Sequence, residues 1–160
     1  MTHDAPTINL DLGEHHEAGR VGELEHSSNV HRLQPLRILL SGLDRRFTRV
    51  TSFLLTRRGY DVAEAPPSHV VDAAERHRAD VVLLDCGASR AAAALKIAAL
   101  HALATGPSVL IVVDGEAAQA RWEGLPWIEK WMPIDTLADR IEAAASTREP
   151  PLPEMERTYQ

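Results

Sequence analysis

The chain contains, at residues 80–85, the stretch Asp-Val-Val-Leu-Leu-Asp. An unbroken run of branched aliphatic residues is typical of a strand covered on both faces, and such strands lie inside parallel sheets. The run ends in a carboxylate, Asp85. We therefore expect a central strand with an acidic side chain at its carboxyl end.

Similar apolar runs precede and follow this stretch, at 36–41, 60–65, 109–113 and 127–132. Each run is followed by a segment with apolar residues at helical spacing. These segments are 45–58, a stretch from Ser68 onward, 89–104, 116–123 and a stretch after Pro133. Alternating strands and helices with right-handed crossovers predict an α/β fold, a doubly wound five-stranded parallel sheet in a three-layer sandwich.

Helical spacing also predicts which side chains face the sheet. The inward residues expected are Phe47, Val50, Leu54 and Leu55 in the first helix, Val70, Val71 and Ala74 in the second, and Leu95, Ile97, Leu100 and Leu103 in the third. Ser68 is the expected N-cap of the second helix, and Gly59 is the expected stop of the first.

Charge and composition divide the chain into three segments. Of the net charge of -6, residues 1–34 carry -4 and residues 147–160 carry -1, so the middle is nearly neutral. We expect 1–34 to be a flexible acidic arm rich in histidine, 35–146 to be the folded domain, and 147–160 to be a flexible proline-rich tail. The histidines of the arm show no regular ligand spacing, so no metal site is expected.

The composition also excludes several classes of protein. A net charge of -6 argues against general nucleic-acid binding, and no apolar run is long enough for a membrane span. The one cysteine, Cys86, excludes an internal disulfide framework and favours the cytoplasm. No glycine-rich phosphate loop is present, so we expect no cofactor.

Four stretches together resemble the receiver (CheY-like) domain of two-component response regulators. They are ILLSGLDRRFTRVTSFLLTRRGYDVAEA at 38–65, ADVVLLD at 79–85, PSVLIVV at 107–113 and WMPIDTLADRI at 131–141. The resemblance implies the flavodoxin-like sheet of that family. It also implies that Asp85 stands where receivers accept a phosphoryl group from a histidine kinase, with the help of a divalent cation.

The resemblance also locates departures from the family's site. Receivers hold the cation with two acidic residues after the first strand, and those positions are Gly42 and Leu43 here. Asp44, one residue further on, is the nearest carboxylate, and we expect its side chain to point outward.

The remaining partners of the phosphoryl group are altered as well. The family's hydroxyl at the end of the fourth strand is replaced by Val113, with Asp114 beside it, and the family's lysine before the last proline is replaced by Met132. Lys130 lies two residues earlier, about 7 Å further back along a regular strand. The degenerate phosphoacceptor site therefore comprises Asp85, Asp44, Asp114 and Lys130.

These departures favour a pseudo-receiver, a non-enzymatic interaction module that has lost magnesium-dependent phosphoryl transfer. One alternative is an atypical single-domain response regulator that is phosphorylated on Asp85, with Asp44 or Asp114 in an unusual metal site. A second alternative is a small-ligand binder on a flavodoxin-like sheet.

Two groups of residues are candidates for partner binding. Trp122, Trp127 and Trp131 lie near the surface through which receivers make their output contacts, although a tryptophan on a buried strand can equally pack inward. Arg45 and Arg49 share a helix face in the region where receivers meet kinases, or that face is simply solvated. The partners implied are a histidine kinase, a phosphotransfer protein, another complex component or a second copy of the chain.

Overall fold

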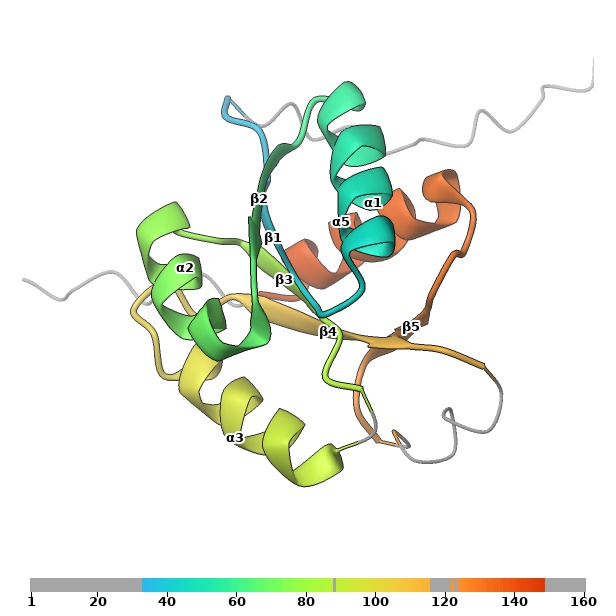
Figure 1. Ribbon diagram of the computed structural model, residues 1–160. Helices are drawn as coiled ribbons and strands as arrows, with labels where there is room; N and C mark the ends of the chain where they lie inside the picture. Colours follow the sequence, from blue (N-terminus) through green and yellow to red (C-terminus); the bar gives the residue numbers. More distant parts are fainter. Residues whose placement is uncertain (1–32, 88, 116–121, 123, 149–160) are drawn as a thin grey trace, which may run out of the picture. The chain divides into compact units, whose positions relative to one another are not determined.

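The computed structural model describes residues 33–87, 89–115, 122 and 124–148 (Figure 1). Five parallel strands form one sheet in the order β2-β1-β3-β4-β5. They are β1 (Arg37–Ser41), β2 (Asp61–Ala65), β3 (Val81–Leu84), β4 (Ser108–Val113) and β5 (Trp127–Glu129). The apolar run before Asp85 is the central strand, and the predicted fold class is confirmed.

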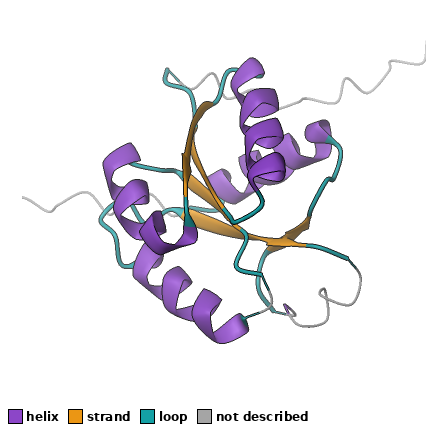
Figure 2. Cartoon of the chain, viewed as in Figure 1, coloured by secondary structure: helices purple, strands orange, loops and turns teal. Residues whose placement is uncertain are grey.

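Helices cover both faces of the sheet (Figures 1 and 2). They are α1 (Arg45–Arg57), the short 3-10 helix η1 (Pro67–His69), α2 (Val70–His77), α3 (Arg90–His101) and α5 (Ile134–Ser146). Helices α1 and α5 lie on one face, and α2 and α3 lie on the other. This is the predicted three-layer arrangement.

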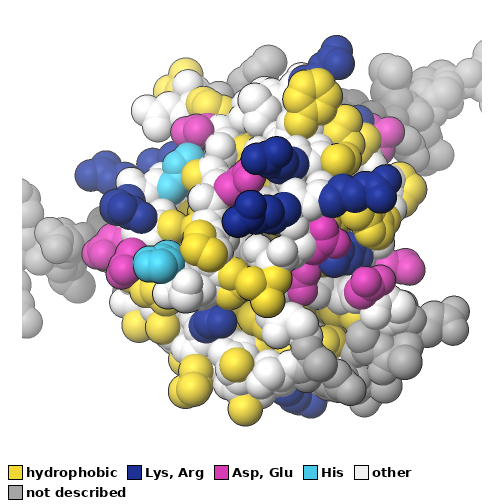
Figure 3. All heavy atoms as spheres, in the orientation of Figure 1, with side chains coloured by type: hydrophobic (Ala, Val, Ile, Leu, Met, Phe, Trp, Pro, Cys, Tyr) yellow, Lys and Arg dark blue, Asp and Glu magenta, His cyan; other side chains and the backbone are white. Residues whose placement is uncertain are grey.

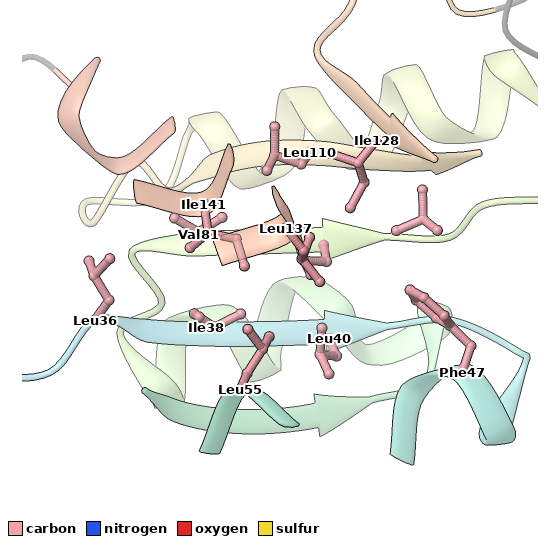
Figure 4. Packing of buried hydrophobic residues seen from close by; sticks show 12 residues of the cluster. Leu36, Ile38, Leu40, Phe47, Leu55, Val81, Leu110, Ile128, Leu137 and Ile141 are labelled. Atoms are coloured by element: carbon pink, nitrogen blue, oxygen red, sulfur yellow. The ribbon is translucent and has the colours of Figure 1, made fainter. Parts of the chain in front are cut away.

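Alternate side chains of the strands supply the two cores, as a pleated sheet requires. Ile38 and Leu40 of β1 pack with Leu55 of α1 and Leu137 and Ile141 of α5 (Figure 4). Leu39, between them, faces the opposite core with Val70 and Leu100.

The start of α1 is set by Asp44, whose Oδ1 accepts hydrogen bonds from the N–H groups of Arg46 and Phe47 at 3.0 and 3.1 Å. The expected inward face was partly wrong, since Val50 is 41% exposed and Leu54 is only half-buried. The buried stripe contains Thr48 and Thr51 with Phe47 and Leu55 instead. Positions four apart align along a helix, so Thr51 lies in line with Phe47 and Leu55 while Val50 lies beside that stripe.

Three further expectations are corrected. Ser68 lies within η1 and caps nothing, because α2 begins only at Val70. Val71 is half-buried against the core, in line with its expected inward position. Leu95 is 75% exposed, and the fully buried Ala93 faces the core in its place. β5 ends at Glu129 rather than residue 132.

Several predictions concern segments outside the described residues. The helix expected over 116–123 falls there, apart from Trp122, and so do almost all of 1–34 and most of 147–160. Among the described residues, no helix has the length and apolar character to cross a membrane.

Candidate functional site at the carboxyl edge of the sheet

Asp44, Asp85 and Lys130 meet at the carboxyl edge of the sheet. The Nζ atom of Lys130 lies 2.8 Å from Oδ2 of Asp44 and 3.5 Å from Oδ2 of Asp85. The lysine side chain is only 9% exposed and that of Asp85 only 16%, whereas Asp44 is 36% exposed. One ammonium group thus lies between two carboxylates.

The sheet places each of these groups. Asp85 directly follows β3, and its N–H donates to the carbonyl of Ser41 at the end of β1 at 2.8 Å. Lys130 directly follows β5, and its N–H donates to the carbonyl of Val113 at 2.7 Å. Parallel strands bring their carboxyl ends to one edge, so residues 45 positions apart become neighbours.

The position of Lys130 corrects an expectation from the resemblance to receivers, which placed Met132 at the lysine position and Lys130 further back along the strand. Trp131 adopts a left-handed backbone conformation with φ of 66°, and the N–H of Met132 donates back to the carbonyl of Glu129. This turn ends β5 early and leaves the lysine at the strand end. Met132 packs against the core beneath α1 and α5.

The two paired groups stabilise each other's charged forms. Hydrogen bonds from Lys130 and from the N–H of Phe47 hold the pKa of Asp44 below its usual value. Burial alone would lower the pKa of Lys130, but the hydrogen bond to Asp44 and the charge of Asp85 outweigh it and raise the pKa. The 2.8 Å contact shows that the carboxylate of Asp44 points toward Lys130, contrary to expectation. The raised pKa keeps Lys130 protonated at neutral pH.

The residues at this edge do not fit a divalent cation. Gly42 and Leu43 offer no side-chain oxygen, and Leu43 is 82% exposed. A Cβ atom on Gly42 would lie 2.9 Å from Cβ of Asp85, so the close approach of Asp85 depends on glycine. The described residues contain no group of three or more acidic, histidine or cysteine side chains able to bind a metal ion.

Two other positions do not join the site. Val113 is buried among Ile111, Ala93 and Trp122. Asp114 is exposed and makes no hydrogen bond or ion pair with the described residues, so it is not brought to Lys130.

The three tryptophans have different environments. Trp122 is 1% exposed and belongs to the core, which corrects its expected role in partner contact. Trp127 is half-buried. Trp131 is 50% exposed and packs edge-to-face on Phe47 at a centroid distance of 5.3 Å.

Helix α1 presents a mixed basic and apolar surface, which we call the α1 surface: Arg45, Arg46, Arg49, Val50, Phe53, Arg57 and the adjoining Trp131. Val50 and Phe53 are 41% and 60% exposed. The guanidinium of Arg46 lies 5.9 Å from the ring centre of Trp131, and that of Arg57 lies 5.7 Å from the ring centre of Phe53. Figure 3 shows basic side chains gathered over this helix.

Sequence reasoning identified Arg45 and Arg49 but missed the apolar part of the α1 surface. Arg45 and Arg49 are exposed beside a hollow of about 290 Å³ that Gly42 and Glu64 also line. The sequence predicts Val50 in the core, which the structure does not bear out. Phe53 falls outside the expected inward spacing of the helix, and that spacing is the signal for its exposure.

The fold is similar to solved receiver domains. A response regulator receiver domain from Methanospirillum hungatei is 20% identical, with a TM-score of 0.57, covering 71% of this chain and 95% of that one. One from Sinorhizobium medicae is 15% identical, with a TM-score of 0.58, covering 74% and 100%. One from Clostridium thermocellum is 18% identical, with a TM-score of 0.57, covering 69% and 94%.

No protein-family model matches the sequence, and no curated protein is significantly similar to it. At these identities the likeness establishes the receiver fold and leaves the function to be argued from the site.

Proposed function

We propose that this protein is a pseudo-receiver, a non-enzymatic interaction module whose Asp85 does not accept a phosphoryl group. The observation that carries the proposal is the ammonium of Lys130, which lies between Asp44 and Asp85 at 2.8 and 3.5 Å.

Charge at the site supports this function. Two carboxylates and one ammonium sum to -1. Phosphorylation of Asp85 would replace its carboxylate charge of -1 with a phosphoryl charge of about -1.5 to -2, so the site would become more negative. Phosphoryl transfer relies on a divalent cation to offset such charge. Gly42 and Leu43 supply no side-chain carboxylate for a hard cation.

The proposal is tested by chemical phosphorylation. The protein is incubated with Mg²⁺ and acetyl phosphate, its intact mass is measured, and Asp85→Asn serves as the control. We expect no phosphorylated species in either protein. A mass increase in the wild-type chain that Asp85→Asn abolishes would overturn the proposal and establish the atypical response regulator.

With phosphoryl transfer lost, the module acts by binding, and the α1 surface is the proposed contact. Exposed Val50, Phe53 and Trp131 provide apolar area, and Arg46 and Arg57 lie over the two aromatic rings. Aromatic and arginine side chains are enriched in interface hot spots. A helix with an apolar stripe flanked by carboxylates is complementary to this arrangement.

Photo-crosslinking in the native host tests the contact. Benzoylphenylalanine is placed at Phe53, and a matched control is placed at Leu95 of α3, which is also well exposed. We expect a protein adduct at position 53 that decreases when Arg46 and Arg57 are changed to glutamate. Equal adducts at both positions would contradict the assignment of the α1 surface.

A further inference from the structure

A cavity of about 510 Å³ opens at the end of the sheet opposite to Asp85. Leu125, Pro126 and Trp127 form one wall, and Ala143, Ala144 and Thr147 at the end of α5 form another. The hydroxyl of Ser108, the first residue of β4, donates to the carbonyl of Ala144 at 2.7 Å. This hydrogen bond joins the end of α5 to β4. We call this cavity the β4 groove.

The β4 groove exists because β5 is short. β5 pairs only with Ile111–Val113, so the first half of β4 has no strand beside it on that side. In Figure 1, β5 lies at the edge of the sheet. An open sheet edge beside an aromatic side chain is a surface that native proteins commonly cover.

Two basic side chains line the same groove. Arg140 of α5 and His101, the last residue of α3, both contribute to its walls, and neither has an ion pair with a described residue. The groove therefore combines an aromatic wall with the positive charge of Arg140 and the hydrogen-bonding ring of His101, which suits an extended segment that is both apolar and acidic.

The chain itself supplies such a segment at the rim. Thr147 lines the groove, and Arg148 is held by its Nη1 atom 3.2 Å from Oδ1 of Asp80. Directly after it the sequence reads Glu-Pro-Pro-Leu-Pro-Glu, residues 149–154. Proline-rich segments of this kind favour the polyproline II conformation and dock against aromatic side chains.

We propose that residues 149–154 fold back into the β4 groove of the same molecule. Leu152 and the prolines pack against Trp127, and Glu149 and Glu154 approach Arg140 and His101. Leu152 follows Arg148 by four residues, a reach of about 12 Å in polyproline II. Because the segment is tethered at the rim of the β4 groove, its effective concentration there is in the millimolar range. Contacts of low affinity are therefore enough to hold the segment in the groove.

Fluorine NMR on the full-length protein labelled with 5-fluorotryptophan tests this proposal. Each resonance is assigned by a tryptophan-to-phenylalanine variant. We expect Leu152→Glu to shift the Trp127 resonance alone, while the same substitution at the exposed Leu95 of α3 leaves it in place. If Leu152→Glu is folded and its Trp127 resonance is unchanged, the proposal is overturned.

A charge exchange tests the polar contacts independently. Arg140→Glu is expected to displace the segment and shift the Trp127 resonance as Leu152→Glu does. Adding Glu149→Arg and Glu154→Arg to that variant should return the resonance toward its wild-type position. A triple variant that resembles Arg140→Glu contradicts the assigned pairs.

Dilution distinguishes the same molecule from a second copy. The Trp127 resonance of the wild-type protein should not change over a hundredfold dilution if the contact is intramolecular. A shift toward the Leu152→Glu position on dilution would overturn the proposal in favour of exchange of the segment between two copies.

Discussion

Gly42→Ala is the smallest change that tests the packing beneath Asp85. The added Cβ would lie 2.9 Å from Cβ of Asp85 and 3.5 Å from its Oδ2. Two carbon atoms in contact prefer about 3.5 to 4.0 Å, so roughly 0.6 Å of overlap must be absorbed. Asp85 has little freedom to move, because its N–H is bonded to Ser41 and its carboxylate faces Lys130.

The expected loss of stability follows from two opposing effects. Overpacking of a tight site costs about 1 to 3 kcal/mol. Replacing glycine with alanine restricts the unfolded chain and returns about 0.4 to 1 kcal/mol. From the middle of each range, we expect Gly42→Ala to lower the free energy of unfolding by about 1.3 kcal/mol.

Urea denaturation followed by circular dichroism measures this loss, with Leu43→Ala as the exposed neighbouring control. The substitution is repeated in two backgrounds that separate the Cβ contact from the charge. Asp85→Ala keeps the Cβ atom, so the loss should persist there, whereas Asp85→Gly removes it and the loss should disappear. The same penalty in both backgrounds, or no penalty in the wild-type chain, would show that the contact with Asp85 is not the cause.

Three further outcomes are expected. Asp44→Asn keeps the cap of α1 but loses the ion pair, whereas Asp44→Ala loses both and should melt at a lower temperature than Asp44→Asn. Because the pKa of Asp44 is lowered in the folded protein, its contribution to stability is present above about pH 4 and is lost as the pH falls. Burial and the hydrogen bond to Glu142 raise the pKa of Tyr60 to about 12. Its contribution to stability is therefore present below about pH 10 and is lost as the pH rises toward 12. Tyr60→Phe should remove the highest-pH step in the tyrosine absorbance titration, and a step that persists would belong to another residue. Trp122→Ala should cost about 3 to 5 kcal/mol in urea denaturation, and Trp131→Ala, at half exposure, should cost clearly less; equal losses would contradict the burial of Trp122.

Local patterns predicted the fold because each element carries its own signal. The run before Asp85 is apolar at every position, and a strand with that pattern needs cover on both faces. The amphipathic spacing from residue 45, with Gly59 after it, indicated the extent of α1 to within one residue. Predictions of inward residues were less accurate for the alanine-rich α3. There the small side chain of Ala93 is buried against the core, whereas the larger Leu95 is exposed.

The candidate site was predicted only in part. Asp85 followed from the end of an apolar strand, and Lys130 was placed in the right region but too far back. Its true position depends on the left-handed conformation of Trp131, which packs on Phe47. A contact between residues 84 positions apart is not visible in the spacing of either segment.

The β-α alternation, the order of the elements and the absence of acidic residues at Gly42 and Leu43 are properties of the linear chain. They follow from residue type and periodicity, which act over a few neighbouring positions. The bridge from Lys130 to Asp44 and Asp85, the burial of Trp122 and the exposure of Val50 arise only when strands and helices pack. Packing sets the turn after β5 and the rotation of α1, and these determine which side chains meet at the carboxyl edge.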